Sequence, residues 1–438
     1  MTRSASLSRR GFLAAAAASS AARAMGRTPY GGRLRLAVPW PIVSLEPASL
    51  SDGFSALFAG AAFEPLYAVD GAGNPYPALA DALPSKLDAG CRLTLRAGLE
   101  TAGGRGLTGA DVVATIARAR SRGGVGLLGE LENPRVDAKD PLSVVFAHGA
   151  ADVVARTLAN PLLALVPRNF SPLAPDGCGA FKVELSRGRA VLTRNPKAAR
   201  GASFLEAIEV TSVNDMADLL RGFEANQTDI GWFGTGLYRA VKDAVAFETP
   251  RYAFAVLMAG KAVGAWGAPG TLQALLDAVP AQQLSHLGVR ALPTQASGSV
   301  SWGGPATTIA ALANAPQLLA IARALAGTLS TPGHELTVVE KTAEELLALQ
   351  NSRQFGLLLD AVRAPTAAAR DIEIALRTAA SPEAAKRAPR TVAQSPRELG
   401  RQLPLGVIGD LTIWGARRAP FVGVEAWQLG AVYLRSDR

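Results

Sequence analysis

The chain has little that could hold it in a membrane. Beyond its N-terminal region it lacks an uninterrupted apolar run of about eighteen residues, whereas a membrane-spanning helix needs about twenty. Charged residues are also scarce, at 18% of the 438 residues, while 49% are hydrophobic. This composition argues against disorder and supports large buried cores. We therefore expect a soluble body of roughly two or three domains.

Cysteine and histidine are rare, with two and three residues respectively. The histidines lie far apart, and none has a metal-ligand spacing such as H-E-x-x-H. The chain also lacks a G-x-S-x-G nucleophile motif and a Walker loop. One G-x-G-x-x-G string spans residues 104–109, but the predicted strand before it ends several residues too early for a dinucleotide-binding turn. We therefore expect no enzyme activity, no cofactor and no metal.

Basic residues do not form a nucleic-acid surface. The net charge is +9, but four arginines and no acidic residue lie within the first 24 residues. The remaining basic residues are scattered, and no stripe of them alternates with aromatic residues. Binding to nucleic acid is therefore not expected, although an anionic partner is compatible with the charge.

The N-terminal region has the three parts of a secretory signal. Ser8-Arg9-Arg10-Gly11-Phe12-Leu13 is polar and basic, a modest apolar run extends to Ala22, and Ala22 and Ala24 are the small residues that signal peptidase requires. The first part resembles the twin-arginine export motif. We expect residues 1–24 to pass through the twin-arginine translocase and to be cleaved between Ala24 and Met25. The alternative is an amphipathic or disordered N-terminus.

Export has two consequences. Position 25 is Met and not Cys, so no lipid anchor is expected at the cleavage site, and the mature protein would be free in the periplasm. In that oxidising compartment Cys91 and Cys178 could form a disulfide, but two buried free thiols are equally ordinary in a chain of this length.

Two kinds of segment follow along the chain. In the N-terminal half, residues 31–39, 91–96 and 142–146 read as strands, the first of which stops at its proline, residues 180–193 read as a hairpin, and Thr108-Gly109-Ala110-Asp111 reads as a helix cap. Strand, helix and strand then follow one another over residues 207–233 and again over residues 335–359. Such units build parallel sheets, so the chain is predicted to contain two α/β lobes.

Several short segments resemble the family 5 extracellular solute-binding proteins of ABC importers, which carry oligopeptides, dipeptides or nickel. The match is specific at residues 107–113, LTGADVV, which resemble the family pattern lTAeDVv. Residues 177–183, GCGAFKV, are similar to GTGPfkv, a turn position that makes Cys178 structural and not nucleophilic. Further matches occur in the family's order at residues 34–39, 44–48, 63–67, 75–80, 93–99, 193–196 and 226–230.

The resemblance implies an α/β fold with a two-lobed, periplasmic-binding-protein-like architecture of the class II or cluster C type. Mixed sheets flanked by helices would enclose a cleft between the lobes. The expected organisation is lobe I at residues 25–250, with an extra subdomain at about 60–176, a shortened lobe II at residues 251–399, and a return to lobe I at residues 400–438. A monomer would capture a peptide or small molecule and deliver it to an ABC permease in the inner membrane.

Two departures from the family bear on the ligand. Residues 268–281 lack the charged residues of the corresponding family segment. In peptide-binding members an aspartate within a GWxADY segment grips the ligand's amino terminus, but here Ala364 falls where that aspartate would be, and Asp360 is out of step. The loss of this aspartate makes a free peptide a less expected ligand and favours modified peptides, glycans, opines or metal chelates. A sensor or a protein of a specialised metabolic pathway is the alternative function.

Ligands of open α/β sheets bind at the carboxyl ends of strands. The candidate ligand-binding residues at such places are aromatic residues, which would form flat apolar walls, and charged residues, which would complement charges on the ligand. Trp302 is a further candidate, in a loop. For the aromatic residues the alternative is core packing, and for the charged residues it is a solvated surface. The complete set is Trp40, Trp232, Phe233, Trp302, Asp360 and Arg363.

Overall fold

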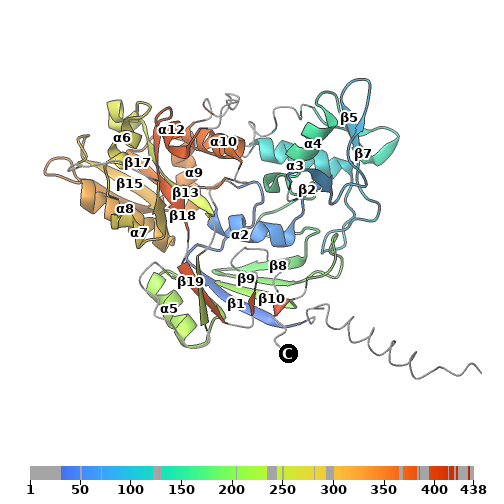
Figure 1. Cartoon of the computed structure of the whole chain (residues 1–438), viewed down its shortest axis with the longest axis horizontal. Helices are drawn as coiled ribbons and strands as arrows, with labels where there is room; N and C mark the ends of the chain where they lie inside the picture. Colours follow the sequence, from blue (N-terminus) through green and yellow to red (C-terminus); the bar gives the residue numbers. More distant parts are fainter. Residues whose placement is uncertain are drawn as a thin grey trace, which may run out of the picture.

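The computed structural model in Figure 1 describes most of the chain after residue 30. The described residues are 31–49, 52–70, 72–121, 128, 131, 133–203, 205–233, 244–248, 251–280, 282–292, 300–364, 368–381, 384, 394–412, 414–418, 421–422 and 433–434. The export signal and the cleavage site between Ala24 and Met25 lie outside them. Within these ranges, no helix combines the length and the apolar character needed to cross a membrane.

A seven-stranded mixed sheet forms the first lobe, in the order β12-β19-β11-β1-β10-β9-β8. β1 pairs in parallel with β10 and β11, and β8 and β9 form the predicted hairpin. The first four side chains of β1 alternate between exposed and buried, as the pattern RLRL predicts, and Ala37 and Val38 are also buried. Helices α2 (Gly53–Ala62) and α5 (Met216–Glu224) belong to this lobe. The strands are β1 Arg33–Val38, β8 Phe181–Ser186, β9 Arg189–Arg194, β10 Ala207–Ser212, β11 Ile230–Phe233, β12 Ala244–Glu248 and β19 Trp414–Arg418.

A six-stranded sheet in the order β14-β18-β13-β17-β15-β16 forms the second lobe. Every residue of its central strands β13 and β17 is buried, because helices cover both faces. The strands are β13 Ala253–Ala259, β14 Val289–Ala291, β15 Thr307–Leu312, β16 Leu336–Lys341, β17 Leu357–Val362 and β18 Leu405–Leu411. The helices are η3 Lys261–Gly267, α6 Thr271–Asp277, α7 Gln282–Ser285, α8 Pro316–Leu329, α9 Ala343–Ser352, α10 Ala369–Ala380 and α12 Pro396–Gly400.

A third unit, which we call the subdomain, is a four-stranded sheet in the order β4-β5-β7-β6 packed with α3 and α4. It has its own apolar core and lies within the expected segment 60–176, on the right of Figure 1. A separate hairpin, β2-β3, precedes it, and a short pair, β20-β21, closes the described chain. The bounds are β2 Tyr67–Val69, β3 Pro75–Pro77, β4 Ser85–Lys86, β5 Cys91–Thr94, α3 Gly109–Ser121, β6 Arg135–Asp137, β7 Asp140–Phe146, α4 Ala151–Thr157, η2 Pro161–Leu163, β20 Phe421–Val422 and β21 Tyr433–Leu434.

The chain crosses between the two large sheets twice. It passes from β12, which ends at Glu248, to β13, which begins at Ala253, and it returns between β18 and β19, after Leu411. The expected return at residue 400 therefore falls too early, since β18 still pairs with β13 in the second lobe. We propose that the two crossings form the hinge between the lobes.

Candidate ligand site between the lobes

Arg363 follows β17 of the second lobe and reaches the first lobe. Its guanidinium is buried, with 7% of the residue exposed, and Nη1 donates a 3.4 Å hydrogen bond to the carbonyl of Ser49. Burial lowers the pKa of Arg363 to about 10, and the charge of Asp52 partly offsets this effect. Within the described part of the chain this long bond is its one hydrogen bond, although a guanidinium has five N–H donors. Arg363 therefore has donors available for a ligand.

Asp52 supplies the negative charge near Arg363. It caps the N-terminus of α2, where its carboxylate accepts a 3.0 Å bond from the Phe54 amide and a bond from the Ser55 hydroxyl. Burial raises the pKa of Asp52, while these hydrogen bonds and the charge of Arg363 lower it. The pairing of a carboxylate from one lobe with a guanidinium from the other favours a close approach of the lobes.

Hydrogen bonds through Ser55 connect the Asp52 carboxylate to a second ion pair, between Glu46 and Arg118. The Ser55 hydroxyl accepts a 2.9 Å bond from the amide of Glu46, and Arg118 of α3 grips the Glu46 carboxylate with Nε, at 2.9 Å, and Nη2. Arg118 also lies over the ring of Phe170, 4.7 Å from its centroid. Polar contacts therefore run without interruption from the subdomain to Asp52, and they fix the side of the site that belongs to the first lobe.

Trp40 is buried close to the hinge. Its ring centroid lies 5.2 Å from that of Tyr252 in an edge-on arrangement, and a Cβ at Gly53 would come within 3.0 Å of the indole nitrogen. The Tyr252 hydroxyl donates a 2.6 Å bond to Gln317 Oε1 of the second lobe. These contacts account for the burial of Trp40, so it packs between the lobes and does not form an exposed wall.

Asp360 lies within the second lobe and not at its surface. With 6% of the residue exposed, its carboxylate accepts 2.8 Å bonds from Gln350 Nε2 and from the amide of Ala361. Burial raises its pKa to about 7. No hydrogen bond or ion pair joins Asp360 to Arg363. The alternative of a solvated surface is wrong for both residues, and the structure does not bring them together.

Of the three remaining aromatic candidates for ligand binding, one lies in a core and two have side chains outside the described part of the structure. Trp302 is fully buried, donates a 2.8 Å bond to the carbonyl of Pro305 and packs against Trp266 at 4.4 Å, so it belongs to the core of the second lobe. Trp232 and Phe233 end β11, where their backbones pair with β19 next to the second crossing. Their side chains lie outside the described part of the structure, so their role stays a prediction.

A cavity of about 380 Å³ lies where the subdomain meets the second lobe. Asn160 Nδ2 donates a 3.1 Å bond to Asp371 Oδ2 at its wall, and Leu162 packs with Ile374 beside it. The sequence analysis did not identify these residues. Asn160 and Asp371 are 211 positions apart, and such a contact has no local sequence signal.

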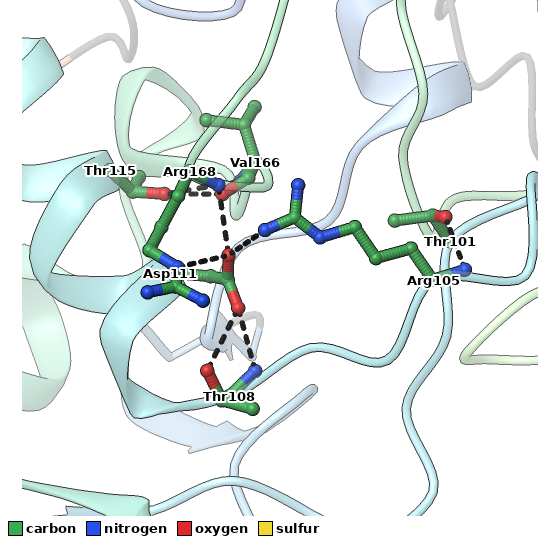
Figure 2. Close-up of polar contacts among 7 residues, drawn as sticks. All are labelled: Thr101, Arg105, Thr108, Asp111, Thr115, Val166 and Arg168. Carbon is green, nitrogen blue, oxygen red and sulfur yellow. Dashed lines mark hydrogen bonds and ion pairs between the residues drawn. The ribbon is translucent and has the colours of Figure 1, made fainter.

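Figure 2 shows that the LTGAD motif forms a closed polar cluster. The buried carboxylate of Asp111 accepts bonds from the Thr108 amide at 2.9 Å, the Thr108 hydroxyl at 3.0 Å, Arg105 Nη2 at 3.2 Å and the Arg168 amide at 2.8 Å. Thr115 similarly bridges both backbone groups of Val166. The Asp111 carboxylate therefore fastens the start of α3 to the preceding segment and to Arg168, which gives the end of the glycine string a structural role.

The two cysteines are free, buried thiols in the core of the subdomain, so the disulfide between Cys91 and Cys178 is not formed. Burial raises the pKa of Cys178 to about 12, which suppresses the nucleophilic thiolate. Across the described ranges, no group of three or more His, Cys, Asp or Glu side chains could hold a metal ion.

The comparisons with known proteins concern the fold. No family model and no curated protein sequence matches the chain. Among solved structures, the oligopeptide-binding protein AppA from Bacillus subtilis, in complex with a nonapeptide, matches 93% of this chain and 100% of its own, with 13% identity and a TM-score of 0.69. The murein tripeptide-binding protein MppA from Escherichia coli covers 93% and 99%, with 13% identity and a TM-score of 0.69.

A third similar structure is AgaA from A. tumefaciens R10, in complex with agropinic acid. It covers 93% of this chain and 99% of its own, with 14% identity and a TM-score of 0.67. Alignment over almost the whole length of both chains, together with the two large sheets and the two crossings, identifies the architecture. The chain has the two-lobed α/β fold of the periplasmic solute-binding proteins.

Proposed function

We propose that this protein is an exported, monomeric solute-binding protein of an ABC importer. It would capture a peptide or peptide-like small solute between its lobes in the periplasm and deliver it to a permease in the inner membrane. The fold supports this proposal, as do the similar structures, which bind peptides or agropinic acid. The observation that carries it is Arg363, a buried guanidinium at the contact between the lobes with donors left over.

The mechanism follows from this geometry. With the lobes apart, water solvates Arg363 and Asp52. On closure both groups lose water, and burial of an incompletely paired guanidinium is costly. A solute that supplies oxygen acceptors to Arg363 removes this cost in the closed state alone. It therefore binds the closed state more tightly and shifts the population toward it, without any chemical reaction.

The test is to identify the solute. Protein comprising residues 25–438 is purified from the periplasm, denatured, and the released small molecules are analysed by mass spectrometry. A solute that is released, and that raises the melting temperature and lowers the radius of gyration when added back, supports the proposal. Protein that releases nothing, and that no peptide, opine, sugar or metal chelate stabilises, contradicts solute capture and favours a sensor or a partner-binding protein.

Export is tested separately. Replacing Arg9 and Arg10 by lysine should leave the precursor in the cytoplasm if the twin-arginine translocase carries it, because that route depends on the paired arginines. Fractionation followed by immunoblotting measures the result. Normal export of the double-lysine variant would contradict the twin-arginine route.

A further inference from the structure

The cavity between the subdomain and the second lobe has walls from both sides. Its walls on the subdomain side come from the end of β2, from α4 and from the residues just after α4, and α10 supplies the opposite wall. These elements lie side by side in Figure 1. Its volume of about 380 Å³ lies in the range of small-molecule sites. The cavity exists because the two parts are in contact, so a molecule inside it would touch both.

Positive charge enters the cavity from both walls. Arg156 of α4 uses one donor on the carbonyl of Gly73, at 2.9 Å, and the rest of its exposed guanidinium is available. Arg370, in the first turn of α10, is exposed and forms no hydrogen bond or ion pair with any described residue. Two cations on opposite walls repel each other, so an anion bound between them would be stabilised by both.

The other lining groups supply one negative charge against these two cations. The single acidic lining residue is Asp371, whose carboxylate also accepts the hydrogen bond from the neutral amide of Asn160, so the lining keeps a net positive charge. Ala368 is the N-cap of α10 and has no side chain that could cap its first turn, which adds partial positive charge to the wall. Val69, which is 52% exposed, and Val153 provide apolar surface. The lining of the cavity therefore has a positively charged part and an apolar part.

We propose that this cavity binds the carboxylate of a small organic acid, which Arg156 and Arg370 hold from opposite sides. The apolar surface favours an organic acid over inorganic phosphate. The inference rests on the proposed function, because it assigns an acidic group to the captured solute and makes that group a link between the subdomain and the second lobe.

The experiment uses glutarate as the probe, and its neutral analogue glutaramide and inorganic phosphate as controls. Affinity is measured at low ionic strength by calorimetry on residues 25–438. Glutarate should bind the parent protein more tightly than glutaramide or phosphate. Arg156→Gln and Arg370→Gln should each weaken glutarate about tenfold, since each removes hydrogen bonds to a charged group. Arg187→Gln, which changes an exposed arginine in the β8–β9 turn, should have no effect.

Three results would overturn the inference: equal affinity for glutarate and glutaramide, no binding of glutarate at all, or equal loss in the Arg187→Gln variant. Phosphate binding as tight as glutarate would assign an inorganic anion and contradict the organic acid. The proposed function is judged by a different measurement. A released solute whose affinity is unchanged in Arg156→Gln and Arg370→Gln keeps the solute-binding function and removes this site, whereas a protein with no solute removes the function itself.

Discussion

Asn160 donates a 3.1 Å hydrogen bond from its amide to the carboxylate of Asp371, and this contact joins the subdomain to the second lobe. Asn160→Asp should separate the two parts. It replaces the donor by a second carboxylate, and two like charges at this distance repel by about 1 to 4 kcal/mol. We expect a larger radius of gyration in solution scattering at pH 7 and weaker solute binding. The local cap is retained, because the other oxygen still accepts the 3.0 Å bond from Leu162.

The matched control reverses the pair. In Asn160→Asp combined with Asp371→Asn, an amide again faces a carboxylate, so the radius of gyration and the affinity should return toward those of the parent protein. If the single variant is as compact as the parent at pH 7, the hydrogen bond does not hold the lobes together.

Arg363→Met should separate ligand binding from stability. Met removes the positive charge that faces the buried Asp52 carboxylate, so the free energy of unfolding should fall, by up to about 3 kcal/mol. The affinity for the released solute should fall at least about tenfold, because the donors at the lobe contact are gone. Urea denaturation and calorimetry measure the two effects. A loss of several kcal/mol with unchanged affinity would mark Arg363 as structural.

Asp360 should make stability depend on pH. Its pKa is raised from 3.8 to about 7 by burial, so the folded state holds a proton that the unfolded state has already released. The contribution of Asp360 to the free energy of unfolding should therefore be largest below pH 4. It should decrease by up to about 4 kcal/mol as the pH rises to 7. Asp360→Asn should remove this slope and be more stable at pH 8. If the free energies of unfolding of the parent protein and of Asp360→Asn change with pH in the same way, Asp360 does not titrate in this range.

Asp111→Asn should destabilise the subdomain without affecting the ligand. The carboxylate accepts four hydrogen bonds, and an amide would direct N–H groups at donors (Figure 2). We expect a loss of about 3 kcal/mol in the free energy of unfolding. Solute affinity of the folded variant should stay the same. A change in affinity alone would place this cluster in the binding site instead.

Cys91 and Cys178 should both be unreactive thiols in the native protein. Both are buried, and the pKa of Cys178 is raised to about 12, so little thiolate forms at neutral pH. Iodoacetamide should label neither residue under native conditions, and should label both in guanidinium chloride without a reductant. Labelling that appears only after reduction would demonstrate a disulfide.

Local sequence patterns predicted several elements correctly. Strand β1, the β8–β9 hairpin and the β10-α5-β11 unit follow from alternating or periodic apolar residues and from an N-cap that the sequence offers at Asn214 or Asp215 and the structure places at Asp215. At the start of α9, Thr342 and Glu345 bond reciprocally in a capping box, a local motif that the sequence displays. In each of these elements the determining contacts lie within a few residues or between adjacent strands.

Other elements could not be predicted in this way. Residues 261–333 have a weak pattern, yet they contain α6, α8 and β15. α8 is rich in alanine and leucine and is buried over much of its surface, so it has no marked polar face. α10 also escaped prediction, because it is buried on both sides, against the six-stranded sheet and against the subdomain.

The sequence by itself determined the α/β class, the order of the units and the bond from the Thr108 amide to Asp111 at the start of α3, because these depend on short-range periodicity and local hydrogen bonding. Only the tertiary structure decided that Asp360 is buried inside a lobe and that Arg363 meets Ser49 of the other lobe. It also decided that Arg156 and Arg370 face one cavity. The physical reason is that burial and charge pairing between distant segments depend on how the lobes pack, and no pattern along a single strand or helix records that packing.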